Sequence, residues 1–168
     1  MIAVEPKLAS DTRCQLIRWM GVLDANPTGN VHGGTVMRLC DEAAALAAIK
    51  HSRRRVVTVA MDRMTFLHPI QVGELLTLSA SVNAAWRTSM EVGVRVDAEI
   101  PWTGEVRHSN SAYLTMVALD DDGNPAPVPS LIPTTPDEQR RMREAELRRA
   151  NRLAEREQIV AHRANEPH

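Results

Sequence analysis

The carboxylate of Asp41 stands in a stretch of mostly small and apolar residues, "NPTGNVHGGTVMRLCDEAAALAA" (26–48), that begins with turn-forming residues. Partial burial raises the pKa of a carboxyl group, which suits it to take a proton from water. Asn30 precedes it by eleven residues. An asparagine side chain both donates and accepts hydrogen bonds, so it can position a water molecule or bind an oxyanion. These residue types favour a hydrolytic or proton-transfer site.

Two adjacent glycines, Gly33 and Gly34, lie where the helical pattern begins. The first N–H groups of a helix have no acceptor inside the helix, and the positive end of the helix dipole is there. Such a helix start can polarise a carbonyl group or hold an oxyanion. The alternative interpretation is that the glycine pair only makes a tight turn into the helix.

The charged neighbours of Asp41 offer an interpretation without chemistry. Arg38 and Glu42 lie within one helical turn of it, and a surface cluster of ion pairs would explain all three charges. If Asp41 is catalytic, Gly34 is about 10 Å away along the helix axis, too far for one carbonyl group to reach both. A two-fold dimer with antiparallel helices would solve this, and the alanines at 43–48 would let the partner helix approach closely.

One helix and a series of strands must hold these residues. Residues 33–49 are apolar or small on nearly every side of a helix, which predicts a helix buried on most sides. Strands with few residues between them predict an antiparallel sheet, and this sheet must wrap around the helix because nothing else covers it. The fold class is therefore α+β. The strand-like segments are 12–23, 56–70, 74–86, 89–102 and 105–120.

The two ends of the chain differ from its centre. We expect a flexible arm over residues 1–10, a folded domain over 11–130 and a helical extension over 131–168. Residues 137–163 are rich in Glu, Arg and Ala, which favours a helix. That helix is either solvated and crossed by Glu–Arg pairs or packed across a subunit boundary.

Composition excludes several classes of protein. The net charge of −1 argues against nucleic acid as a partner, and no apolar run has the length of a membrane span. The first residues lack the layout of a secretion signal, so we expect a cytoplasmic protein. Cys14 and Cys40 have no paired spacing and are expected to be reduced thiols. No metal-ligand spacing, P-loop, Rossmann or GxSxG motif is present, so neither a metal nor a bound cofactor is expected.

The stretch 26–48 resembles the central-helix signature of the hotdog-fold acyl-CoA thioesterases, in particular the broad-specificity branch that includes the brain-type cytosolic enzyme. Residues 55–76, 86–96 and 111–129 resemble the same family in order and spacing. The resemblance implies a long antiparallel sheet wrapped around one central helix. It also implies homodimers with sites shared across the interface, assembled as trimers of dimers.

The resemblance also implies an activity and its residues. The reaction is hydrolysis of acyl-CoA to a carboxylic acid and CoA, with CoA belonging to the substrate. Asp41 falls on the family's catalytic acid, as general base or nucleophile, and Asn30 on its catalytic asparagine. Gly33 and Gly34 fall on the paired glycines that polarise the thioester carbonyl. His32 departs from the family's usual phenylalanine; it is a catalytic candidate that either helps to polarise the thioester or serves as a wall residue or a hydrogen-bonding spectator.

Substrate contacts are expected from two basic segments and one strand. CoA carries several phosphate charges, which arginine side chains bind well. The residues expected to bind substrate are Arg54, Arg55, Val57, Thr58, Arg87, Thr88 and Ser89.

Two other functions are open. A hotdog hydratase or dehydratase would use His32 as the partner of Asp41, and a non-catalytic regulator would bind acyl-CoA without cleaving it.

Overall fold

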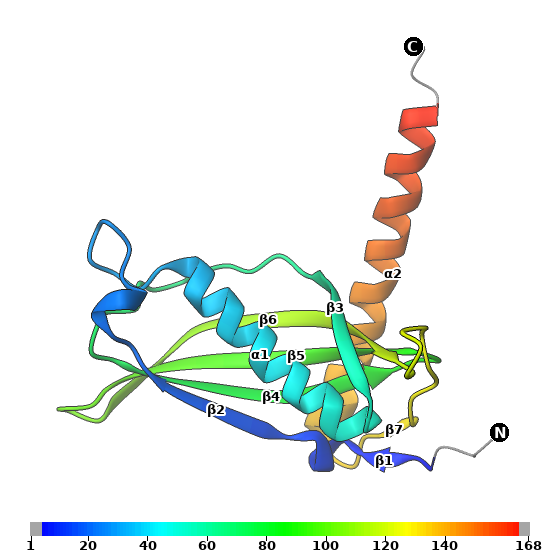
Figure 1. The fold of residues 1–168 in the computed structure, drawn as a ribbon, viewed down its shortest axis with the longest axis horizontal. Coiled ribbons are helices and arrows are strands. Elements are labelled where there is room, and N and C mark those ends of the chain that lie inside the picture. Colours follow the sequence, from blue (N-terminus) through cyan, green and yellow to red (C-terminus); the bar gives the residue numbers. More distant parts are fainter. Residues whose placement is uncertain (1–4, 165–168) are drawn as a thin grey trace.

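The computed structural model describes residues 5–164 and is built on one long helix, α1 (Gly33–Ser52). This helix lies across the face of a curved sheet of five strands (Figure 1). The strand order is β2-β4-β5-β6-β3, and every neighbouring pair is antiparallel, which confirms the predicted fold class. The strands are β2 (Cys14–Trp19), β3 (Arg55–Met61), β4 (Leu75–Ala85), β5 (Ser89–Ile100) and β6 (Glu105–Leu119).

Two strands are shorter than the sequence predicts. The segment 12–23 forms a strand only at Cys14–Trp19, between the 3-10 helices η1 (Ala9–Thr12) and η2 (Val22–Asp24). The segment 56–70 leaves the sheet after Met61, so its second half is irregular chain. Beyond Met61 the regular ladder is replaced by isolated backbone bonds to β6, from the N–H of Asp62 to the carbonyl of Tyr113 at 2.9 Å and from the N–H of Leu67 to the carbonyl of Ser109 at 3.3 Å.

The chain before β2 is ordered where the structure describes it. The short strand β1 (Lys7–Leu8) pairs in parallel with β7 (Leu131–Ile132). The ammonium group of Lys7 donates to the carbonyl of His51 at 2.6 Å, at the C-terminal end of α1, where a cation is favourable. Residues 7–10 are therefore not a flexible arm, and residues 1–4 of that predicted arm lie outside the described residues.

The alanines of α1 pack against the sheet of their own chain. Ala43, Ala44, Ala47 and Ala48 are each 0% exposed. Their small side chains bring the helix backbone close enough for the Cys14 thiol to donate to the carbonyl of Ala43, at 3.5 Å. The prediction that these alanines admit a partner helix is therefore wrong, because the sheet already occupies that face.

The opposite face of α1 is uncovered and carries apolar residues beside the Arg38–Glu42 ion pair. Met37, Leu46 and Ile49 are all more than 40% exposed. Cys40 lies on the sheet side of α1 and is fully buried. Burial raises the pKa of its thiol to about 12. Cys40 is therefore a packing residue with an unreactive thiol.

The C-terminal helix, α2 (Pro136–Ala164), begins with a capping box. The N–H of Glu138 donates to the hydroxyl of Thr135, and the N–H of Thr135 donates to the Glu138 carboxylate, both at 3.2 Å. The same carboxylate, only 3% exposed, accepts from the N–H of Thr134 at 2.8 Å and from Arg13 at 2.7 Å. The carboxylate thus joins the start of α2 to the segment before β2.

The first half of α2 packs on its own sheet, and the second half projects away from it (Figure 1). Ala145 is buried, and two arginines tie the helix to the sheet: Arg148 to Glu91 and Arg152 to Asp62, both at 2.7 Å. Exposed Glu–Arg pairs are also present, as between Arg140 and Glu144. Within the protomer the helix is therefore half packed and half solvated. No helix within residues 5–164 is long and apolar enough to cross a membrane.

The capping box predicts an acid-sensitive contribution to stability. Hydrogen bonds from the N–H of Thr134 and from its neighbours hold the pKa of Glu138 below its usual value. Because the folded-state pKa is the lower one, this stabilisation is fully present above the unfolded-state pKa of about 4.3 and is lost as the pH falls below it. We expect Glu138→Gln to lower the free energy of unfolding by about 1–2 kcal/mol at neutral pH, measured by urea denaturation.

The pH profile provides the check. The stability of the variant should fall less than that of the native protein as the pH is lowered from about 5 to about 3, through the unfolded-state pKa of about 4.3. Parallel profiles would show that Glu138 does not carry this linkage.

Candidate active site

Asp41 is held by a threonine from the neighbouring strand. The hydroxyl of Thr58, on β3, donates to Oδ1 of Asp41 and lies 3.2 Å from the sulfur of Met116. Arg38 and Glu42 form an ion pair with each other, and Asp41 takes no part in it. The surface-cluster interpretation therefore does not apply to Asp41. Its Oδ2 has no hydrogen-bond donor among residues 5–164, which leaves it able to accept a proton.

Thr58 lies at an irregularity of its strand. The register between β3 and β6 shifts between Thr58 and Ala60, as in a β-bulge. Bulges redirect side chains and are common beside active sites. Thr58, expected as a substrate-binding or core residue, thus contacts the candidate catalytic carboxylate directly.

His32 caps the start of α1. Its Nδ1 accepts a hydrogen bond from the N–H of Gly34 at 2.9 Å, so the ring nitrogen must be unprotonated in this arrangement. The N–H of Gly33 has no acceptor in the described part of the chain. The ring of Phe66 lies against Gly33, 3.4 Å from the position of an added Cβ. Of the two N–H groups predicted to polarise a carbonyl, that of Gly33 is free to donate, and that of Gly34 already donates to His32.

The loop before α1 is organised by Asn26. Its Oδ1 accepts from the N–H groups of Thr28 at 3.0 Å and Asn30 at 3.2 Å, and its own N–H donates to the carbonyl of Asn30 at 2.7 Å. The side-chain nitrogen of Asn26 donates to no acceptor among the described residues. Sequence reasoning chose Asn30 as the catalytic asparagine and did not consider Asn26, whose side chain organises this loop. The signal for Asn26 was its position two residues before a turn threonine, a common Asx-turn pattern.

The expected substrate-binding residues gather at the end of the sheet that holds Thr58. Val57 and Ser89 both pair with Val117 of β6, so they lie in one row across three strands. Thr88 adjoins this row, because its carbonyl accepts from the N–H of Ala118 at 3.0 Å. Arg87, next in the same hairpin, is exposed.

A pocket of about 540 Å³ lies where α1 meets β3, and Arg54 and Arg55 line it. Arg55 donates to the carbonyls of Asp120 and Asp121 at 2.8 and 2.9 Å, so part of its guanidinium is engaged within the chain. Arg54 is exposed. The pocket therefore offers positive charge at the C-terminal end of α1, beside the start of β3.

The described protomer separates the candidate residues into two groups. Asn26, Asn30 and the capped helix start form one group, and Asp41 with Thr58 forms the other. Seven residues separate Gly34 from Asp41, about 10 Å along α1. A single protomer cannot bring both groups to one carbonyl group.

Comparisons with known proteins agree with this architecture. Residues 28–101 match the family model described as "Thioesterase superfamily". The chain is 36% identical to the cytosolic acyl coenzyme A thioester hydrolase of Rattus norvegicus over 155 residues, 91% of this chain and 41% of the rat protein. The chain thus spans about two fifths of the length of that relative.

Solved structures give closer coverage. An acyl-CoA hydrolase of Staphylococcus aureus, in complex with butyryl coenzyme A, coenzyme A and coenzyme A disulfide, has a TM-score of 0.84 and 34% identity over 95% of this chain and 99% of its own. A hexameric acyl-CoA thioesterase in its apo form has a TM-score of 0.87 and 38% identity over 90% of this chain and 97% of its own. The chain belongs to the thioesterase superfamily and has its hotdog fold, which confirms the resemblance seen in the sequence.

Proposed function

We propose that the protein hydrolyses acyl-CoA thioesters to a free carboxylic acid and CoA. The observation that carries the proposal is the contact between Asp41 and Thr58: a carboxylate outside the ion pair of its helix, oriented by a hydroxyl, with one oxygen left to accept a proton. The names and bound ligands of the similar proteins support acyl-CoA as the substrate class.

Residue spacing supports the same assignment. The Staphylococcus aureus hydrolase has been solved as three variants, in which an asparagine, an aspartate and a threonine are each replaced by alanine. These positions are 15 and 17 residues apart, and Asn26, Asp41 and Thr58 have the same two separations. We therefore assign the asparagine of the site to Asn26. Asn30 then shapes the loop through its backbone.

In the proposed mechanism, Asp41 acts as general base. Thr58 fixes Oδ1, and Oδ2 takes a proton from the attacking water as its oxygen bonds to the thioester carbon. The open N–H of Gly33 polarises the carbonyl oxygen, and rotation of His32 away from Gly34 adds a second donor. The carbon–sulfur bond then breaks and the thiolate of CoA leaves with little acid assistance, because a thiol is much more acidic than an alcohol. The proton on Asp41 finally passes to solvent or to the thiolate.

The distance between the two groups requires a second protomer. We propose that Asp41 of one chain meets the helix start of its partner, giving two equivalent sites for each dimer. The uncovered apolar residues of α1 and the edge strand β3, where Val57 and Val59 are 42% and 58% exposed, support a dimer on this side of the molecule. The hexameric relative supports a trimer of dimers. A cytoplasmic location remains part of the proposal, supported by the cytosolic relative.

The function is tested by measuring thiol release from a panel of acyl-CoA substrates, from acetyl to palmitoyl. A hydrolase releases free thiol and free carboxylic acid in equal amounts. Tight binding of the same substrates without thiol release would instead show a binding regulator and end the proposal.

The shared site predicts that two inactive variants restore activity when mixed. Gly33→Val places a branched side chain over the helix start, where a Cβ would already contact the ring of Phe66 at 3.4 Å, and Asp41→Asn removes the base. Unfolding and refolding the two together should give heterodimers with one intact and one doubly altered site. We expect roughly a quarter of native activity from an equal mixture, because half of the dimers are mixed and half of their sites are intact.

Each variant refolded alone should remain inactive, which is the control. If the mixture also remains inactive although mixed dimers are detected by mass spectrometry, each site is built from a single chain.

A further inference from the structure

A buried asparagine of β6, Asn110, has no hydrogen-bond partner. It is 1% exposed, and neither its Oδ1 nor its Nδ2 has a partner among residues 5–164. We propose that Asn110 lies at the end of the acyl site and binds a hydroxyl group on the acyl chain. The proposal rests on the proposed hydrolysis of acyl-CoA, and it makes hydroxyacyl thioesters the preferred substrates of that reaction.

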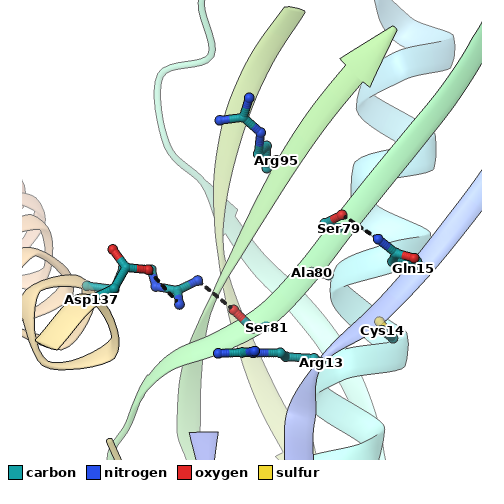
Figure 2. A pocket seen from close by; sticks show the side chains of 9 residues that line it. Arg13, Cys14, Gln15, Ser79, Ala80, Ser81, Arg95 and Asp137 are labelled. Atoms are coloured by element: carbon teal, nitrogen blue, oxygen red, sulfur yellow. Dashed lines mark hydrogen bonds and ion pairs between the residues drawn. The ribbon is translucent and has the colours of Figure 1, made fainter. Parts of the chain in front are cut away.

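The register of the strands places Asn110 on the face of the sheet that α1 covers. Arg95 of β5 lines a cavity together with Asp137 of α2, so its side chain lies on the face away from α1 (Figure 2). Side chains alternate between the two faces of a strand, and Val96 therefore faces α1, as part of the core. Val96 pairs directly with Asn110, and directly paired residues share a face.

The surroundings of Asn110 within the sheet are apolar. Val96 lies opposite it, Leu78 of β4 lies beyond Val96, and Ala112 is the next residue of β6 on the same face. All three are at most 1% exposed. An amide without a hydrogen bond is destabilising in such surroundings and rare in native proteins, so it needs an explanation. A ligand that brings a hydrogen-bonding group to this point would provide one.

A β-bulge adjoins Asn110. The pairing of β5 with β6 shifts between Val96 and Asp97, which leaves Ser109 of β6 without a paired residue. Ser109 is 0% exposed, and its hydroxyl also has no hydrogen-bond partner in the described part of the chain. Bulges redirect side chains and are common beside active sites. Two adjacent buried residues of β6 thus carry polar groups that nothing within the protomer satisfies.

An irregular segment connects Asn110 to the start of α1. Residues 62–74, between β3 and β4, form no helix or extended strand. The ring of Phe66 lies against Gly33, 3.4 Å from an added Cβ, and the N–H of the next residue donates to the carbonyl of Ser109 at 3.3 Å. An acyl chain whose carbonyl group is held at the N–H of Gly33 therefore reaches Asn110 by passing under Phe66. That side chain is 43% exposed, so its ring has room to rotate toward solvent.

A hydroxyl group suits Asn110 better than a hydrocarbon chain or a keto group does. The hydroxyl group donates to Oδ1 or accepts from Nδ2, so it pairs with the amide in either orientation of the side chain. A keto group only accepts, and a hydrocarbon chain leaves both amide atoms unpaired. A site built to bond a substrate hydroxyl group rejects the analogue that lacks it.

Thiol release from hexanoyl-CoA, 3-hydroxyhexanoyl-CoA and 6-hydroxyhexanoyl-CoA, measured on the full chain, tests the proposal. We expect kcat/KM for at least one hydroxylated ester to exceed that for hexanoyl-CoA at least about tenfold. The preferred position of the hydroxyl group then measures the depth of Asn110 in the acyl site. A smaller ratio for both hydroxylated esters overturns the proposal.

The variant Asn110→Leu connects the preference to the asparagine. Leucine is similar in size but has no hydrogen-bonding group, so the variant should lose the preference for the hydroxylated ester. It should also unfold at a higher urea concentration than the native protein, because the unpaired amide is gone. Asn151→Leu makes the same change at an exposed position of α2 and should keep the native preference.

Retention of the native ratio in Asn110→Leu would overturn the proposal. The comparison of the three esters on the native protein needs no variant, so it remains decisive even if Asn110→Leu fails to fold. Absence of thiol release from all three esters would contradict the proposed hydrolysis and not the role of Asn110. Equilibrium binding of the same esters would then test Asn110 by the same ratio.

Discussion

Asp41→Asn should lower kcat for acyl-CoA hydrolysis by about a hundredfold to ten-thousandfold, with little change in the binding of acyl-CoA. Asparagine keeps the size of the side chain and still accepts the hydrogen bond from Thr58, but it cannot take a proton from water. The loss should therefore fall on kcat and not on folding. Thiol release measures the rate. Circular dichroism checks that the variant is folded, and equilibrium binding checks that it still binds the substrate.

The matched control is Glu42→Gln. Glu42 is the next residue of the same helix, but its carboxylate pairs with Arg38 at the surface, where its side chain is 47% exposed. An exposed pair of this kind contributes little, so we expect nearly native kinetics. If Asp41→Asn and Glu42→Gln had similar rates, Asp41 would not be the base.

Arg148→Met should lower the free energy of unfolding by about 3–5 kcal/mol. Its partner Glu91 has a side chain that is 1% exposed, and Arg148 donates to it from Nη2 at 2.7 Å and from Nε at 3.2 Å. The guanidinium also stacks on Tyr113, with 3.7 Å to the ring centroid. Methionine fills similar space but leaves the Glu91 carboxylate buried with a neutral donor, Asn83 at 3.3 Å, and the more distant Arg152 at 3.6 Å. Urea denaturation at fixed protein concentration measures the change, because assembly adds to stability.

Two further variants separate the buried charge from general damage to α2. Arg143→Met, at an exposed position, should stay within about 0.5 kcal/mol of the native value. The double variant Glu91→Gln with Arg148→Met should recover part of the loss, because the unpaired charge is gone. A double variant no more stable than Arg148→Met alone would show that lost packing, and not the buried charge, dominates.

Patterns that depend on near neighbours were predicted well. The alternation of apolar and polar residues located β4, β5 and β6 within two residues at each end, and the glycine pair located the start of α1. The end of α1 was missed by three residues. The helix stops at Arg53 in a left-handed conformation with φ 55°, a position usually taken by glycine, so the sequence carries no local stop signal.

Only part of the candidate site could be predicted from local sequence patterns. Asp41 and Thr58 were both chosen from the sequence, Asp41 as a catalytic residue and Thr58 as a substrate contact. Their contact with each other was not predicted, because no local pattern shows that β3 returns to the side of α1. Asn26, which we propose as the asparagine of the site, was not chosen from the sequence. Its position became informative only beside the matching separations in a solved relative.

The sequence by itself determined the elements, the antiparallel sheet around one helix and the unusual carboxylate on that helix, because periodicity and composition act over a few residues. The tertiary structure alone decided which surfaces those elements cover. It turned the alanines of α1 toward their own sheet, left Met37, Leu46 and Ile49 uncovered, and joined Thr58 to Asp41. These outcomes depend on contacts between residues far apart in the chain, which the curvature and register of the sheet fix and no local pattern encodes.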